Sequence, residues 1–123
     1  MPAAPPPAAR TPPPFWRRRR VIVADASMAP TLRPGDRLLV DAGAYRRAAP
    51  RVGDVVVLVD PTAPERWLVK RVAAVDPAAA AVEVRGDAEA GSRDSRTFGP
   101  VPFRLLRGRV DRIYGPPERV RGL

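Results

Sequence analysis

The sequence contains no cysteine and no histidine, and it also lacks asparagine and glutamine. Without cysteine there is no disulfide, no thiolate metal site and no cysteine nucleophile. Without histidine there is no Ser-His-Asp triad and no imidazole zinc site, and the commonest general base is missing. We therefore expect no metal and no cofactor. Any catalysis must use hydroxyls, carboxylates, Arg, Lys and backbone amides.

Long apolar segments are missing as well. The longest apolar runs, 55–59 and 78–82, are far shorter than the ~20 residues that a membrane-spanning helix needs. We therefore expect no membrane-spanning segment and a cytoplasmic location, with peripheral membrane association as the alternative. That association would use the basic run Arg17, Arg18, Arg19, Arg20, which suits weak contact with anionic lipid.

The net charge of +9 is concentrated near the N-terminus, where residues 1–20 hold five arginines, no acid and many of the 17 prolines. The composition predicts a disordered tail over 1–20, one domain over 21–115 and a C-terminal tail over 116–123. We expect a monomer. A small basic β-barrel that binds nucleic acid is an alternative from another class, but with 6% aromatic residues stacking platforms are hard to place, and we expect no nucleic-acid partner.

From residue 21 onward the pattern is typical of β-structure. Short runs rich in β-branched residues alternate with turn signals such as Pro34-Gly35 and Asp76-Pro77. The predicted strands are 37–41, 54–60, 67–75, 82–85 and about 103–114. This spacing predicts a mainly β fold with little helix, built as a single small curled antiparallel sheet or barrel.

Lys70 stands out because it is the only lysine among 22 basic residues. Arginine carries charge equally well but does not lose its proton near neutral pH, so a retained lysine can be one that must deprotonate. On a strand, Lys70 shares its face with apolar Leu68 and Val72. Dry surroundings and the neighbouring charge of Arg71 both favour the neutral amine. The alternative is a lysine that extends its ammonium into solvent at the sheet edge.

Ser27 lies between a short strand and a tight turn, in the segment Asp25-Ala26-Ser27-Met28-Ala29-Pro30-Thr31-Leu32. Such a serine can simply cap unpaired amides. The same geometry also exposes a nucleophile beside backbone N–H donors. A third segment, 86–99, is rich in small polar residues, and its Asp94 and Arg96 are placed to pair across a turn.

Together these three segments resemble the type I signal peptidases and their relatives. The matching residues are Ser27, Met28, Pro30, Thr31 and Leu32, then Gly35-Asp36, then Lys70-Arg71-Val72, and finally Gly86-Asp87, Ser92, Asp94, Ser95, Arg96, Phe98 and Gly99. The resemblance implies a Ser27/Lys70 catalytic dyad. It also implies that Ser92 hydrogen-bonds the lysine and that Asp94 and Arg96 brace the site.

The resemblance further implies a serine endopeptidase that removes an N-terminal leader from a precursor polypeptide. Among small members the chain looks like the soluble maturation protease of nickel-type superoxide dismutase. A general signal peptidase acting on exported preproteins is the alternative. One departure concerns Asp25: the family usually has Gly or Ser there, and an ionised carboxylate cannot donate to an oxyanion. The backbone N–H of Ser27 is then expected to act with another donor.

Overall fold

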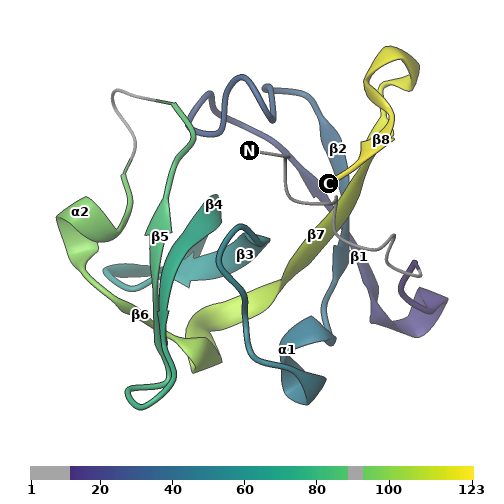
Figure 1. Cartoon of the computed structure of the whole chain (residues 1–123). Helices are drawn as coiled ribbons and strands as arrows, with labels where there is room; N and C mark the ends of the chain where they lie inside the picture. Colours follow the sequence, from purple (N-terminus) through teal and green to yellow (C-terminus); the bar gives the residue numbers. More distant parts are fainter. Residues whose placement is uncertain (1–11, 89–92) are drawn as a thin grey trace, which may run out of the picture.

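A single antiparallel sheet of eight strands dominates the computed structural model, which describes residues 12–88 and 93–123. The strand order is β1-β2-β7-β3-β4-β5-β6, and β8 pairs with β7. The strands are β1 (Arg18–Ile22), β2 (Arg37–Asp41), β3 (Val55–Asp60), β4 (Ala63–Asp76), β5 (Ala81–Arg85), β6 (Val101–Pro102), β7 (Leu106–Gly115) and β8 (Arg121–Gly122). The sheet curls but β1 and β6 do not pair, so it does not close into a barrel (Figure 1).

Helical segments are short. They are α1 (Ala44–Arg47), α2 (Ser95–Phe98) and the 3-10 turns η1 (Phe15–Arg17), η2 (Phe103–Leu105) and η3 (Pro117–Arg119). Figure 1 shows α2 beside β5 and β6, well away from α1. In the described residues no helix has the length and apolar character needed to cross a membrane. The prediction of a mainly β fold with little helix is confirmed.

β3 forms the centre of the sheet because its residues are suited to burial on both faces. It reads Val-Val-Val-Leu-Val-Asp, and every residue is buried. Antiparallel pairing with β4 on one side and β7 on the other satisfies its backbone groups. Two apolar clusters cover its two faces. The first contains Met28, Leu32, Leu38, Val57 and Ile113, and the second contains Val56, Leu58, Val72, Val84 and Val101.

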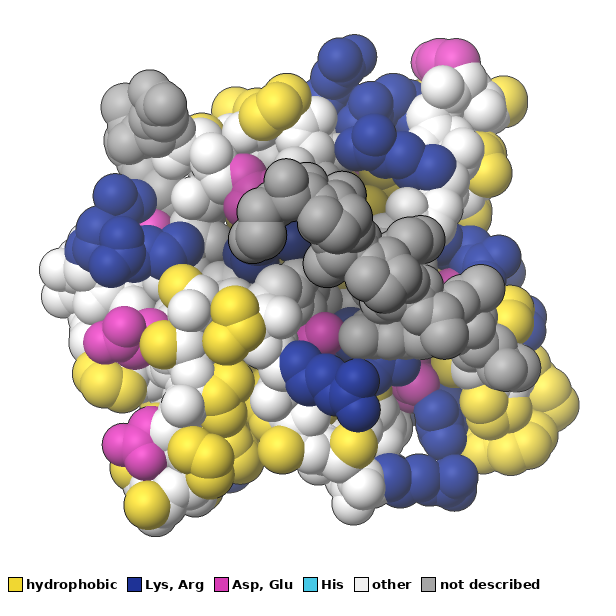
Figure 2. All heavy atoms as spheres, viewed as in Figure 1, with side chains coloured by type: hydrophobic (Ala, Val, Ile, Leu, Met, Phe, Trp, Pro, Cys, Tyr) yellow, Lys and Arg dark blue, Asp and Glu magenta, His cyan; other side chains and the backbone are white. Residues whose placement is uncertain are grey.

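The two ends of the chain contribute to the sheet. Residues 18–20, which the composition placed in the N-terminal tail, form the beginning of β1, in register with β2. Near the other end, β8 folds back onto β7 (Figure 1). On the surface, lysine and arginine side chains gather in several separate groups on the face that Figure 2 shows.

Candidate active site

Ser27 lies in the connection between β1 and β2, which the core holds in place from one side. Its neighbour Met28 is 1% exposed and Leu32 is 0% exposed, so both side chains anchor the turn in the first apolar cluster. The turn is closed by hydrogen bonds from the Ala29 N–H to the Ala26 carbonyl (3.0 Å) and from the Leu32 N–H to the Met28 carbonyl (2.9 Å). Ser27 is therefore half-buried on an anchored turn.

The Pro34-Gly35 turn then returns the chain to β2. Gly35 has φ +91°, a conformation that costs a glycine little and a residue with a side chain much more. The Gly35 N–H donates to the Val23 carbonyl (2.8 Å), and the Val23 N–H donates to the Asp36 carbonyl (2.9 Å). These bonds fix the two ends of the Ser27 connection against each other.

The backbone N–H of Ser27 donates to the Asp25 side chain, with 2.9 Å between N and Oδ1. The pKa of Asp25 is lowered, first by this backbone hydrogen bond, and further by a hydrogen bond from the Ser27 side chain and by the charge of Lys70. The N–H that sequence reasoning assigned to an oxyanion is thus already engaged in this structure. A carbonyl oxygen can use it only after Asp25 has moved away.

Lys70 is held in the middle of β4, opposite Val56 of β3. Lys70 is 2% exposed, so its side chain is buried and does not extend into solvent at the sheet edge. Burial lowers the pKa of Lys70; the carboxylates of Asp25 and Asp94 oppose this effect, and Arg96 adds to it. Desolvation is the largest of these influences, so the neutral amine is favoured relative to a lysine in water.

One cavity of about 90 Å³ brings Ser27 and Lys70 together. Its other walls include Asp25, Met28 and the apolar side chains Val57 and Trp67. The serine comes from the β1–β2 connection and the lysine from β4, so strands far apart in the sequence build this site. A hydroxyl, a buried amine and a largely apolar wall are the components that a serine nucleophile with a lysine base requires.

A carboxylate on the loop after β5 ties the serine turn to β4. Both oxygens of Asp87 accept hydrogen bonds from Arg71, each at 2.8 Å, and Oδ2 also accepts from the Thr31 hydroxyl at 2.7 Å. The next residue reinforces this link, because the Ala88 N–H donates to the Ser27 carbonyl at 3.0 Å.

Sequence reasoning gave Asp87 no role and expected the charge of Arg71 to favour a neutral Lys70. In the structure Arg71 is paired with Asp87. The arginine that lowers the pKa of Lys70 is Arg96. The spacing of Arg71 and Asp87 alone does not reveal that they meet.

Asp94 and Arg96 form the pair that their spacing predicted. Asp94 is 0% exposed, caps α2 by accepting from the Arg96 N–H, and receives the guanidinium with 2.9 Å between Arg96 Nη2 and Asp94 Oδ2. It also accepts from the Gly86 N–H at 3.0 Å. This pair therefore fixes the loop that carries Asp87. Ser92, the remaining predicted site residue, lies outside the described residues.

The C-terminal segment supplies a support that sequence reasoning missed. Asp36, 2% exposed, accepts two hydrogen bonds from Arg119 at 3.0 and 2.8 Å. Arg119 and Arg121 also donate to the Thr31 carbonyl, at 3.2 and 2.6 Å. Asp36 was visible as part of the Gly35-Asp36 motif. No local pattern marks Arg119 or Arg121, which lie more than 80 positions away along the chain.

Comparison with known proteins shows the family of this chain. The family model described as "Signal peptidase, peptidase S26" matches residues 19–83. The chain belongs to this family. The prediction of a member of the type I signal peptidase family, whose members are serine-type peptidases, is therefore confirmed.

Three curated relatives show how far the similarity extends. The chain is 39% identical over 105 residues to mitochondrial ATP-independent inner membrane protease subunit 1b of Arabidopsis thaliana, covering 68% of this chain and 62% of the relative. It is 34% identical over 117 residues to human mitochondrial inner membrane protease subunit 2, covering 79% and 67%. It is 33% identical over 108 residues to subunit 1 of Xenopus tropicalis, covering 73% and 65%. The chain thus spans about two thirds of the length of these relatives.

These names correct the expected location. The relatives are proteases of the mitochondrial inner membrane, which points to a membrane-associated or mitochondrial location. The expectation of a cytoplasmic protein is wrong. It rested on the lack of a long apolar run in this sequence.

Proposed function

We propose that this protein is a serine endopeptidase that uses Ser27 as nucleophile and Lys70 as general base to remove an N-terminal leader from a precursor protein. One observation carries the proposal. The only lysine of a chain without histidine or cysteine is buried, has a lowered pKa and lines the same cavity as Ser27.

The first half of the reaction forms an acyl-enzyme. The neutral Lys70 amine accepts the proton of the Ser27 hydroxyl as Oγ attacks the scissile carbonyl, and the carbonyl π electrons move to the oxygen. The resulting oxyanion accepts a hydrogen bond from the Ser27 N–H once Asp25 has released it. The carbon–nitrogen bond then breaks, and the proton held by Lys70 passes to the departing amine.

The second half regenerates the enzyme. Lys70, neutral again, removes a proton from water as the water oxygen attacks the ester carbonyl. The ester bond to Oγ breaks, and the proton returns to Ser27. The apolar walls of the cavity keep the amine poorly solvated in both halves. A cavity of about 90 Å³ also suits a small side chain of the substrate next to the bond that is cut.

Two precursors are candidate substrates. Resemblance to small family members suggests the precursor of a nickel-type superoxide dismutase, while the general signal peptidase reading suggests exported preproteins. The curated relatives, named as inner membrane proteases, favour a precursor that is presented at a membrane.

The dyad is tested with purified protein and the two classes of precursor. Lys70→Arg and Ser27→Ala should each abolish cleavage, because a guanidinium does not deprotonate and an alanine has no nucleophile. Arg85→Lys, on the exposed face of β5, is the matched control and should cleave like the wild type. Circular dichroism and melting curves check that each variant is folded.

Near wild-type cleavage by Lys70→Arg would refute the dyad. The choice of substrate is decided separately. If only the exported preprotein is cut, the nickel-precursor assignment fails and the dyad stands.

A further inference from the structure

A second, larger cavity of about 510 Å³ adjoins the Ser27/Lys70 cavity. Both cavities are lined by Val21 of β1, Val57 of β3 and Trp67 of β4. The larger one then continues across Val40, Leu106 and Gly108, that is, over β2 and β7. Its volume lies within the range of about 300–1,000 Å³ that is common for ligand pockets. The two cavities are therefore neighbours that share three wall residues.

Four arginines from four different elements line this larger cavity, and no acidic residue does. They are Arg19 of β1, Arg46 of α1, Arg104 of η2 and Arg107 of β7. The only hydrogen bonds that their side chains make within residues 12–88 and 93–123 go to backbone carbonyls. Arg19 donates to the Arg18 carbonyl at 2.9 Å, and Arg107 donates to the carbonyls of Arg104 at 2.8 Å and Leu106 at 3.5 Å.

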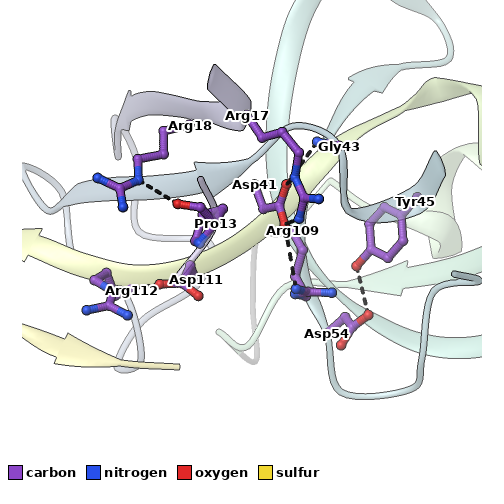
Figure 3. A network of polar contacts seen from close by, with 10 residues as sticks. All are labelled: Pro13, Arg17, Arg18, Asp41, Gly43, Tyr45, Asp54, Arg109, Asp111 and Arg112. Atoms are coloured by element: carbon purple, nitrogen blue, oxygen red, sulfur yellow. Dashed lines mark hydrogen bonds and ion pairs between the residues drawn. The ribbon is translucent and has the colours of Figure 1, made fainter. Parts of the chain in front are cut away.

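Seven other arginines of the described residues do meet carboxylates. Figure 3 shows Asp41 between Arg17 and Arg109 next to this region, with Arg17 Nη2 2.6 Å from Asp41 Oδ2. Arg71, Arg93, Arg96, Arg112 and Arg119 each have an aspartate partner as well. Within the part of the chain that the structure describes, none of the four cavity arginines forms such a pair. Four guanidinium groups without a carboxylate partner among the described residues thus line one hollow, and others of this kind, such as Arg66 and Arg85, lie outside it.

The four arginines give the larger cavity a positive electrostatic potential that attracts anions. Like charges around a concave surface add their potentials, and apolar walls such as Val40 and Phe103 weaken the screening by water. A carboxylate that enters the cavity would relieve the repulsion between the four guanidinium groups. The first 24 residues of this chain contain no acid, so the anion must come from another molecule or another segment.

We propose that the larger cavity is a specificity subsite that binds acidic side chains of the precursor polypeptide while the scissile bond lies at Ser27. This rests on the proposed peptidase function. A peptide is favoured over a lipid headgroup because the arginine-lined cavity shares three wall residues with the Ser27/Lys70 cavity. An extended chain rises about 3.3 Å per residue, and the shared wall residues allow a polypeptide bound at Ser27 to extend towards the larger cavity.

The test uses a set of peptides that share one cleavable sequence. Each peptide carries a single Glu at a different position on one side or the other of the cut bond, and a peptide with Gln at that position is its reference. Glu at one or two positions should raise kcat/KM by about two- to fivefold at low salt, the size of one exposed ion pair. The gain should disappear at high salt because the charges are then screened. Arg46→Glu and Arg104→Glu should reverse the preference towards Lys. Arg85→Glu, outside both cavities, should keep the preference for Glu.

Binding separates this proposal from the peptidase function. Inactive Ser27→Ala protein is titrated with the Glu and Gln peptides, and isothermal titration calorimetry measures binding. Preferential Glu binding without any cleavage by the wild type supports the subsite and refutes the proposed function. Cleavage with no preference for Glu at any position refutes the subsite and leaves the function intact. Absence of peptide preference, combined with Arg46- and Arg104-dependent binding to vesicles of anionic phospholipid, overturns the proposal in favour of a lipid site.

Discussion

Replacement of Lys70 by methionine should abolish cleavage and, at neutral pH, make the fold more stable. The two side chains have similar length and flexibility, so methionine fills the space that Lys70 occupies beside Val56, and a volume-conserving exchange of this kind changes stability by less than about 1.5 kcal/mol. The protonation of the buried amine changes the free energy of unfolding more than this exchange of shape does. The pKa of Lys70 is lowered chiefly by burial, so the folded state holds the proton less tightly than the unfolded state does.

The sign of the pH dependence follows from this difference. The unfolded chain binds more protons than the folded chain between the two pKa values of Lys70, so the wild type gains stability as pH rises through that interval. Each unit by which the folded pKa lies below 10.5 corresponds to about 1.4 kcal/mol. Lys70→Met lacks this penalty. Its advantage over the wild type should therefore be largest at low pH and should shrink as pH approaches 10.5.

Urea unfolding of both proteins at a series of pH values from 6 to above the ordinary lysine value of 10.5 measures this effect. The change in the stability difference across the series, divided by 1.36 kcal/mol per unit, gives the depression of the lysine pKa directly. Lys70→Leu, which is also neutral, is the control for the exchange of side-chain shape and should show the same pH dependence. A stability difference that stays constant with pH, or that grows as pH rises, would refute the reasoning.

Three further expectations concern carboxylates near the site and in the core. Asp25→Asn removes the charge that opposes deprotonation of Lys70 and should move the rising limb of the pH–activity profile to lower pH. Asp25→Ala should do the same and also raise the plateau rate, because it frees the Ser27 N–H; an unshifted limb in both variants would contradict this. Asp94→Ala should lower the free energy of unfolding by about 2–4 kcal/mol, since a helix cap and a buried acceptor are lost together, and Asp94→Asn should lose less by the same urea assay. The pKa of Asp60 is lowered from 3.8 to about 2, chiefly by its hydrogen bond from Arg93 and also by those from Thr62, while burial opposes the shift. Ionised Asp60 should therefore add about 2 kcal/mol to the free energy of unfolding above pH 4, and this contribution should disappear as pH falls towards 2. An Asp60→Asn variant as stable as the wild type at pH 7 would rule this out.

The local sequence pattern determined several strands of this protein and two of its candidate site residues. The strands predicted at 37–41 and 82–85 match β2 and β5 closely, because β-branched residues between turn residues specify extended backbone without help from the rest of the chain. Lys70 and the turn at Ser27 could also be identified from the sequence, because residue type and the immediate neighbours are sufficient to single them out. Their connection to one family came from three segments in the right order, and the family model later matched residues 19–83.

The tertiary structure decided which residues meet. Arg119 reaches Asp36 and the serine turn from the far end of the chain, and Asp25 takes the Ser27 N–H that sequence reasoning had left for the oxyanion. The four arginines of the large cavity, which have no carboxylate partner among the described residues, come from β1, α1, η2 and β7, and no spacing in the sequence distinguishes them from the paired ones. The reason is physical: strand propensity acts over a few residues, whereas ion pairs and cavities depend on how a curled sheet places distant segments side by side.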